Sequence, residues 1–258
     1  MAFSESYVTA GLVIFGLMTF LWLISLRLRN SGIVDIFWGT GFVIACWIYF
    51  GHTPEGCPAR KWLLAFLVTL WGLRLSAHIF YRNAGKGEDF RYRRWREEAG
   101  GHWWWRSYFA VFMLQGLLMW IISAPLLAAQ QAAVPARLTW IDYAAAAVWC
   151  CGFFFEAVGD LQLARFRANP ANKGKVLRAG LWSCTRHPNY FGDAVQWWGF
   201  WGLAVAAGGW WTVFSPLLMT LLLRRVSGVT LLEKTLVATR PGYKEYVETT
   251  NAFFPWFR

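Results

Sequence analysis

Long apolar runs separated by short charged stretches are the dominant pattern of this chain. A helix needs about twenty predominantly apolar residues to cross the hydrocarbon core of a bilayer. Runs of that kind lie near residues 8–26, 33–50, 61–81, 107–128, 140–160, 193–207 and 209–223. The last two runs are short and are joined at Gly208 and Gly209. The pattern therefore predicts an all-α, polytopic integral membrane protein with about seven transmembrane helices.

The chain contains no internal repeat and no low-complexity linker, which predicts a single domain over 1–258. No positively charged segment precedes the run 8–26 and no small-residue cleavage site follows it, so we expect it to be the first span rather than a signal peptide. The sizeable hydrophilic stretches are 82–106, 161–188 and 224–252. Any chemistry on a water-soluble cofactor is expected in these three stretches.

Positive charge is distributed unevenly among the loops. The chain has 25 Lys and Arg residues against 14 Asp and Glu residues, for a formal net charge of +11. All of these cations except Arg60, Lys61, Arg74 and Arg137 lie in the first, third and fifth connections or in the C-terminal tail. Because cytoplasmic loops are enriched in Lys and Arg, the N-terminus is predicted outside and the C-terminus in the cytoplasm. We expect the protein in a bacterial inner (cytoplasmic) membrane.

Composition excludes several classes of protein. Hydrophobic residues make up 57% of the chain and charged residues 15%, whereas an ordinary soluble domain has roughly 25% charged residues. So much apolar surface excludes a disordered chain. The five cysteines are odd in number and lie mostly inside apolar runs, which excludes a disulfide scaffold. The charges come in blocks between long uncharged stretches, so we expect the lipid bilayer as a partner and no nucleic acid.

Familiar motifs for nucleotides and metals are absent. Neither the glycine pattern of the Rossmann fold nor that of the P-loop occurs. There is no H-E-x-x-H motif and no pair of C-x-x-C motifs, and the four histidines are scattered along the chain. We therefore expect no metal site.

Several ionisable residues fall inside or beside apolar runs. A charged side chain in hydrocarbon costs about 3 kcal/mol on insertion scales, so such residues are candidates for function. Asp35 lies just inside the run 33–50. It is either a functional carboxyl or an interfacial acid that pairs with Arg27 or Arg29 or caps a helix.

The third run carries a polar stripe. Arg74 and His78 are one helical turn apart, and Tyr81 continues the same face. A guanidinium, an imidazole and a phenol on one stripe are more typical of a cavity lining than of a single satisfied core residue. A buried structural role for one of them stays open.

The fifth run carries two acids and a downstream cation. Glu156 and Asp160 are four residues apart, and Arg167 follows seven residues after Asp160. All three share one face if the helix continues that far. The alternative is a structural ion pair with Arg82 or Arg165.

The segment 185–193 combines more polar groups than a helix cap requires. Pro188 suits the first turn of a helix, and Asn189 and Asp193 then lie one turn apart. Arg186 and His187 come directly before this start, and a helix N-terminus is a natural anion site. The alternative is a plain helix start followed by a tryptophan-rich interfacial belt.

This segment resembles the C-terminal signature of the steroid 5α-reductase family, and most closely its bacterial branch. The stretches around Val34 to Gly39, Glu88 to Tyr92 and Phe254 to Phe257 are similar to that branch as well. The resemblance implies a seven-helix, NADPH-dependent oxidoreductase of lipid metabolism that acts on CH–CH groups. Its expected reaction saturates the carbon–carbon double bond of a lipophilic enone, as in 3-oxo-Δ4-steroids. The cofactor-binding half is expected at about 82–258 within one transmembrane reductase domain.

The resemblance also carries residue roles. Positions that bind NADPH in the relatives match Asp160, Arg167, Asn189, Asp193 and, less closely, Arg91. We extend the predicted cofactor site to neighbouring cations and motif residues, namely Lys173, Arg186, His187 and Tyr190. Asp35 falls where the relatives place an acid that contacts the substrate ketone. The relatives' catalytic tyrosine has no clear counterpart, and Arg74, His78 or Tyr81 stands in for it.

Two other functions stay open. Membrane methyltransferases of the isoprenylcysteine and phospholipid type, which use S-adenosylmethionine, also carry Arg-His-Pro-x-Tyr and a tail similar to Glu233, Tyr243 and Tyr246. A non-catalytic lipid- or sterol-binding membrane protein is the third possibility. For the reductase we expect a lipophilic small-molecule substrate, a steroid or related enone, and a monomer.

Overall fold

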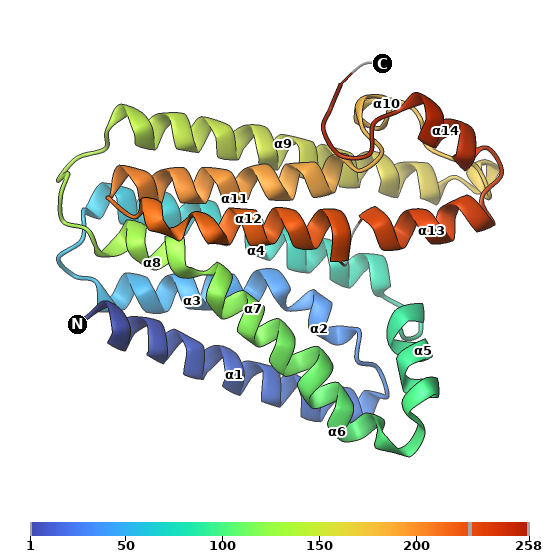
Figure 1. Cartoon of the computed structure of the whole chain (residues 1–258), viewed down its shortest axis with the longest axis horizontal. Coiled ribbons are helices and arrows are strands. Elements are labelled where there is room, and N and C mark those ends of the chain that lie inside the picture. Colours follow the sequence, from blue (N-terminus) through green and yellow to red (C-terminus); the bar gives the residue numbers. More distant parts are fainter. Residues whose placement is uncertain (1, 227–228, 257–258) are drawn as a thin grey trace. The chain divides into compact units, whose positions relative to one another are not determined.

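The computed structural model describes residues 2–226 and 229–256, and the described chain is helical, with no strand among these residues (Figure 1). It forms two compact units. Unit 1 comprises Met1–Thr139 and Ala204–Thr212, and unit 2 comprises Trp140–Leu203 and Val213–Arg258. The expected all-α class is confirmed, whereas the single-domain organisation stays a prediction.

Unit 1 is built mainly from the first eight α-helices. They are α1 (Phe3–Leu28), α2 (Ile33–Ile36), α3 (Trp38–His52), α4 (Pro58–Asn83), α5 (Phe90–Ala99), α6 (Trp103–Ser107), α7 (Leu114–Ile122) and α8 (Ala124–Gln131). A 3₁₀ turn, η1 (Gly100–His102), precedes α6, and a π-helical segment, η2 (Tyr108–Met113), joins α6 to α7. The 3₁₀ turn η4 (Trp210–Val213) lies at the boundary with unit 2.

Close packing of α3 against α4 depends on two glycines. A Cβ atom added to Gly39 would lie 2.2 Å from the carbonyl oxygen of Gly72, so no side chain fits there. Small residues allow membrane helices to approach in this way. On the neighbouring α1, Tyr7 donates to the carbonyl of Trp120 (2.9 Å), and the Trp120 indole donates back to the carbonyl of Tyr7 (2.8 Å). These contacts tie α1 and α7 into the same bundle.

Helix α5 differs from the other helices of unit 1 in direction. Figure 1 shows it beside one end of α1, α3 and α4 and directed crosswise to them. Its start is fixed by Asp89, whose side chain accepts the backbone N–H of Arg91 at 3.0 Å in an N-cap arrangement. The cap places Arg91 and Tyr92 in the first turn, where they face the short helix α2.

Unit 2 contains the long helix α9 and the C-terminal helices. They are α9 (Trp140–Ala168), α10 (Leu181–Cys184), α11 (Pro188–Ala206), α12 (Phe214–Leu221), α13 (Val229–Thr239) and α14 (Tyr243–Thr249). The 3₁₀ turn η3 (Pro170–Asn172) follows α9, and a π-helical segment, η5 (Leu222–Val226), extends α12.

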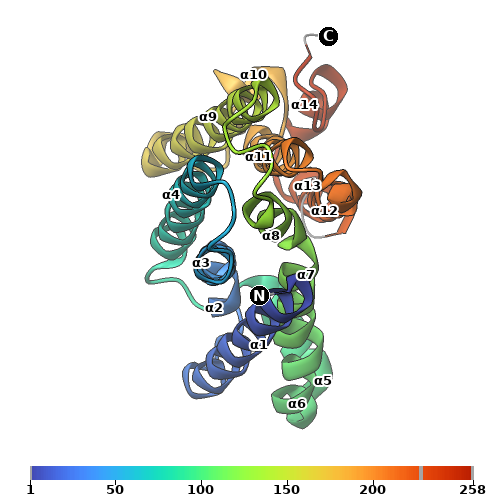
Figure 2. The ribbon, with the colours of Figure 1, turned by 90° about the vertical axis from the view of Figure 1, so that its left-hand side faces the viewer.

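Helices α9 and α11 lie side by side in both views (Figure 1, Figure 2). A Cβ atom on Gly192 would lie 2.4 Å from the backbone nitrogen of Glu156 and the carbonyl oxygen of Gly152. A Cβ atom on Gly152 would lie 2.6 Å from the carbonyl oxygen of Gly192. The two backbones are therefore nearly in contact, which brings the polar residues of both helices together.

Four described helical segments are long and apolar enough to cross a membrane, and they indicate a membrane protein. They are Phe3–Leu28, Pro58–Asn83, Phe90–Gln131 and Trp140–Ala168. They contain the predicted runs 8–26, 61–81, 107–128 and 140–160. The other three predicted runs fall on α3, α11 and the pair α12 and η5. The count of seven spans and the orientation stay predictions.

Candidate functional site

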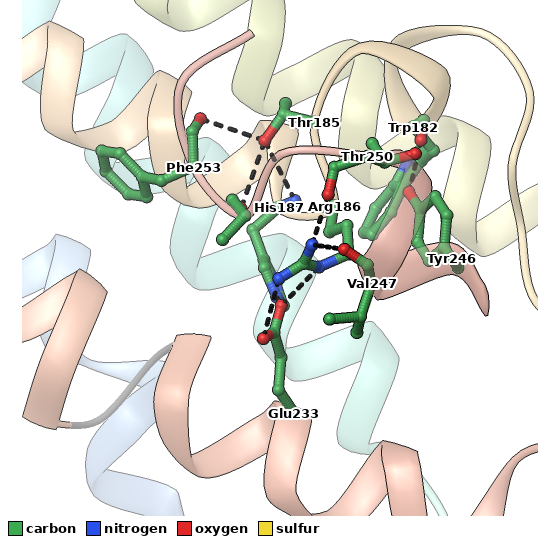
Figure 3. Close-up of polar contacts among 10 residues, drawn as sticks. Trp182, Thr185, Arg186, His187, Glu233, Tyr246, Val247, Thr250 and Phe253 are labelled. Atoms are coloured by element: carbon green, nitrogen blue, oxygen red, sulfur yellow. Dashed lines mark hydrogen bonds and ion pairs between the residues drawn. The ribbon is translucent and has the colours of Figure 1, made fainter. Parts of the chain in front are cut away.

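Arg186 is the centre of a buried polar cluster in unit 2. Its Nε and Nη2 atoms donate to the two carboxylate oxygens of Glu233 at 2.7 and 3.0 Å, the bidentate geometry that makes guanidinium–carboxylate pairs strong. Its Nη1 atom donates to the carbonyl oxygens of Val247 (3.0 Å) and Thr250. We call Arg186, His187, Glu233, Val247 and Thr250 the Arg186 clasp (Figure 3). Because Arg186 is only 6% exposed, its donors serve mainly the protein itself.

The charge of Glu233 is stabilised by its partners. Partial burial of the carboxyl favours its neutral form, but hydrogen bonds and positive charge from His187 and Arg186 outweigh burial and lower its pKa to about 2. The Nε2 atom of His187 lies 3.0 Å from Glu233 Oε1, and its ring stacks on Tyr190 with centroids 5.6 Å apart. The carboxylate thus fixes both residues that precede Pro188.

The C-terminal segment is tied to the same turn. Thr185 Oγ1 donates to the carbonyls of Ala252 (3.2 Å) and Phe253 (3.0 Å), and the Arg186 backbone N–H donates to the carbonyl of Asn251 (2.9 Å). Figure 3 shows the contact of Thr185 with Phe253 beside the contacts of Arg186 with Glu233, Val247 and Thr250. The N-terminus of α11 is therefore held from two sides, by Glu233 of α13 and by the chain after α14.

Asn189 and Asp160 meet where α9 passes the first turn of α11. Asn189 Nδ2 donates to Asp160 Oδ1 at 3.0 Å, and Asp160 is 5% exposed. The Oδ1 atom of Asn189 is buried and has no hydrogen-bond partner in the described part of the chain. Two turns further along α11, Gln196 Nε2 donates to Glu156 at 2.5 Å. The two predicted acids of α9 thus each contact an amide of α11.

Helix α9 continues without a break to Ala168, as the proposed face of Asp160 and Arg167 requires. Arg167 and, in the loop that follows, Lys173 are both exposed. Asp193 is buried one turn after Asn189 on α11. The predicted cofactor residues of unit 2 therefore divide into two exposed cations and a group of buried or partly buried residues on α9, on α11 and directly before α11.

In unit 1, Asp35 pairs with Arg91. The Arg91 Nη2 atom lies 3.1 Å from Asp35 Oδ2, and its Nε atom donates to Asp89 Oδ1 at 2.9 Å. Tyr92 donates to Asp35 Oδ1 at 2.7 Å and accepts a hydrogen bond from Gln115 at 3.2 Å. The ion-pair partner of Asp35 is thus Arg91 of α5, not a cation at the end of α1.

The other two predicted catalytic residues lie on α4. His78 is half-buried, one turn after Arg74. Tyr81 is 77% exposed and its ring contacts the edge of Phe80, with centroids 5.7 Å apart. The continuous helix confirms the stripe of Arg74, His78 and Tyr81, while the catalytic roles stay predictions.

Sequence reasoning missed two members of the Asp35 cluster, Tyr92 and Gln115. Tyr92 follows a residue that was predicted to bind the cofactor, but nothing local shows which way its ring points. Gln115 lies inside an apolar run, where an amide is a signal of the same kind as Asp35. The sequence placed Glu233 in the tail of the methyltransferase pattern and gave no sign that it pairs with Arg186.

Comparison with known proteins adds a family. The profile described as "Protein of unknown function (DUF1295)" matches residues 21–250. The chain belongs to the DUF1295 family. Its relatives in this comparison include "Uncharacterized protein C594.04c" of Schizosaccharomyces pombe, which is 26% identical over 98% of this chain and 80% of the relative. No solved structure matches the chain.

A shorter match points to a different chemistry. The "Probable O-methyltransferase ustE" of Ustilaginoidea virens is 40% identical over 64 residues, which are 24% of this chain and 21% of the relative. So short a match shows local similarity only.

Proposed function

We propose that this DUF1295 protein is an NADPH-dependent membrane reductase that saturates the carbon–carbon double bond of a lipophilic enone, as 3-oxo-Δ4-steroid 5α-reductases do. The observation that carries the proposal is the contact between Asn189 and Asp160 at the buried start of α11. Both residues match cofactor-binding positions of the steroid 5α-reductase family, and they come from segments 29 residues apart.

The residues present fit such a cofactor. The buried Oδ1 atom of Asn189 lacks a donor in the described chain, and an unfilled buried acceptor costs free energy. A carboxamide N–H or a ribose hydroxyl supplies that donor. The exposed cations Arg167 and Lys173 suit the phosphate groups.

Within this proposal, NADPH supplies the hydride. Asp160 orients the Asn189 amide so that its oxygen faces the ligand. The Arg186 clasp positions the start of α11, because four of the five guanidinium N–H groups of Arg186 donate to Glu233, Val247 and Thr250.

Asp35, His78 and Tyr81 remain the proposed groups for the substrate carbonyl. Reduction at the β-carbon of an enone places negative charge on the carbonyl oxygen, and a hydrogen-bond donor there stabilises it. Arg91 and Tyr92 fix the Asp35 carboxyl from two sides, so Asp35 donates to the carbonyl oxygen only in its protonated form, whereas His78 and Tyr81 carry donors of their own. The protein is further proposed to have seven spans, the N-terminus outside, a cytoplasmic C-terminus in a bacterial inner membrane, and a monomeric state.

An S-adenosylmethionine-dependent methyltransferase is the second candidate. The 64-residue match to a probable O-methyltransferase favours it, and so does Glu233, which belongs to the tail of the methyltransferase pattern and contacts Arg186 and His187. A smaller, singly charged cofactor explains those contacts equally well. The reductase is preferred because the Asp160–Asn189 pair and the cations after it have no role in that alternative.

Thermal unfolding of the purified protein in detergent separates the two candidates. A ligand that binds the folded state raises the midpoint of unfolding by mass action. We expect NADPH at about one hundred times its Kd to raise the midpoint by about 5 °C and S-adenosylhomocysteine to leave it unchanged. Stabilisation by S-adenosylhomocysteine alone overturns the proposal in favour of the methyltransferase.

A further inference from the structure

A cavity with one polar side lies wholly within unit 1, away from the contact between Asn189 and Asp160. Its volume is about 340 Å³, which is within the range of small-ligand sites. Ile33 and Ile36 of α2 and Phe80 of α4 form an apolar wall, and the loop between α4 and α5 forms the polar side.

The two acids that line this cavity, Glu88 and Asp89, form ion pairs with cations outside it. Glu88 accepts from Arg96 at 2.8 and 2.9 Å and from the backbone N–H of Ser31 at 2.7 Å. Asp89 accepts from Arg91 at 2.9 Å. Burial of each carboxyl raises its pKa, but these hydrogen bonds outweigh burial and hold both pKa values below their ordinary range. Both acids are thus ionised, and they pair with cations outside the cavity: Glu88 with Arg96, and Asp89 with Arg91, which it shares with Asp35.

The two cations that line the cavity have no carboxylate partner in the described chain. Lys86 donates to the carbonyl of Arg82, and Arg93 donates to the carbonyl of Glu88 at 2.9 Å. Main-chain carbonyls orient these side chains but do not cancel their charge. The cavity therefore keeps a net positive charge beside the amides of Asn30 and Asn83.

We propose that this cavity binds a phosphate ester, with Lys86 and Arg93 as its ligands. An ammonium and a guanidinium with two amides nearby are suited to phosphate oxygens. The apolar wall of Ile33, Ile36 and Phe80 accommodates the organic part of the ester. Neighbouring Arg91, held by Asp35 and Asp89, is the positioning residue of the Asp35 cluster and not a phosphate ligand.

A phosphate ester can come from a nucleotide or from a phospholipid headgroup, and binding measurements separate the two. The probes are NADPH, NADH, which lacks the 2′-phosphate, and short-chain phosphatidylglycerol. Each is titrated against the full-length protein in uncharged detergent and against Lys86→Gln and Arg93→Gln. Arg94→Gln is the matched control, since Arg94 is exposed on the same helix and pairs with Glu98.

We expect both variants to weaken one phosphate probe by about tenfold and the control to bind like wild type. Loss of NADPH affinity with unchanged NADH affinity identifies the 2′-phosphate of the nucleotide, and loss of phosphatidylglycerol affinity identifies a lipid headgroup. The proposal is overturned if both variants bind every probe with wild-type affinity. It is also overturned if the wild-type protein binds none of the probes. The phosphatidylglycerol measurement tests the cavity even if the protein does not reduce an enone with NADPH.

Discussion

Among the individual residues, charges that are buried with their partners hold the start of α11 in place. Arg186 and Glu233 are 47 residues apart in sequence and meet in bidentate geometry. A buried ion pair contributes little net stability, but removing one partner leaves an uncompensated charge. The clasp is therefore sensitive to loss of either member.

Glu233→Gln is expected to destabilise the protein by about 3 kcal/mol, because the buried Arg186 guanidinium loses its counter-charge. The measurement is the free energy of unfolding in denaturant. Glu245→Gln is the control, since Glu245 pairs with Arg178 at an exposed position and its loss is expected to leave stability unchanged. Equal stability of the two variants contradicts the structural role of the clasp.

The same carboxyl predicts a pH dependence. Its pKa is about 2 in the folded protein against an ordinary value of 4.5, so the folded state binds the proton more weakly than the unfolded chain does. Glu233 thus stabilises the fold above pH 4.5, and this stabilisation is lost as the pH falls from 4.5 toward 2. We therefore expect the difference in unfolding midpoint between wild type and Glu233→Gln to become smaller as the pH falls from 4.5 toward 2. A difference in unfolding midpoint that does not change with pH would contradict this role of Glu233.

Asn189→Ala is expected to weaken NADPH binding by about tenfold, because it removes one buried hydrogen bond to the ligand and the orienting contact with Asp160. Asn169→Ala is the control, because Asn169 is exposed and only caps η3. Titration of both variants with NADPH tests this. Wild-type affinity in Asn189→Ala removes the residue from the cofactor site.

At the scale of helices, glycine spacing decides which elements can approach. Gly192→Ala places a methyl group 2.4 Å from backbone atoms of α9 that have no room to move. We expect a loss of about 1–3 kcal/mol from overpacking. Gly16→Ala on α1 meets nothing within 4 Å and is expected to be neutral or slightly stabilising. The thermal midpoints of the two variants provide the comparison, and a neutral Gly192→Ala would mean that α9 and α11 are farther apart.

Much of the helix pattern follows from the sequence, because apolar run length is a local property. The runs 8–26, 61–81 and 140–160 lie inside α1, α4 and α9. The break at Phe37, which separates α2 from α3, was not predicted, since the apolar pattern continues through it.

The sequence predicted which residues belong to the candidate site better than it predicted which residues they contact. Asp35, Arg91, Asn189 and Asp160 were all named from the sequence, but the 56-residue separation of Asp35 from Arg91 hides their contact. The partner of Arg186 was hidden in the same way. A cation before a helix start predicts an anion nearby, and only tertiary structure shows that Glu233 pairs with it.

At the scale of the whole molecule, the distribution of Lys and Arg predicts sidedness. A green fluorescent protein fused after the C-terminus is expected to fluoresce, and alkaline phosphatase fused there is expected to be inactive. Fusions in the connection after α8, near Ala132, are expected to give the reverse. The same pattern at both positions would mean that the span count differs by one.

The central claim, hydride transfer from NADPH to a lipophilic enone, is tested most directly by isotope transfer. Membranes containing the protein are incubated with a panel of 3-oxo-Δ4-steroids and with NADPH deuterated at the transferred position. The masses of the products are then measured by mass spectrometry. The account predicts a product that gains one deuterium and one hydrogen, in amounts that fall strongly with Asp35→Asn. A panel left unreduced, with a methyl group appearing on a lipid when S-adenosylmethionine is supplied, would contradict it.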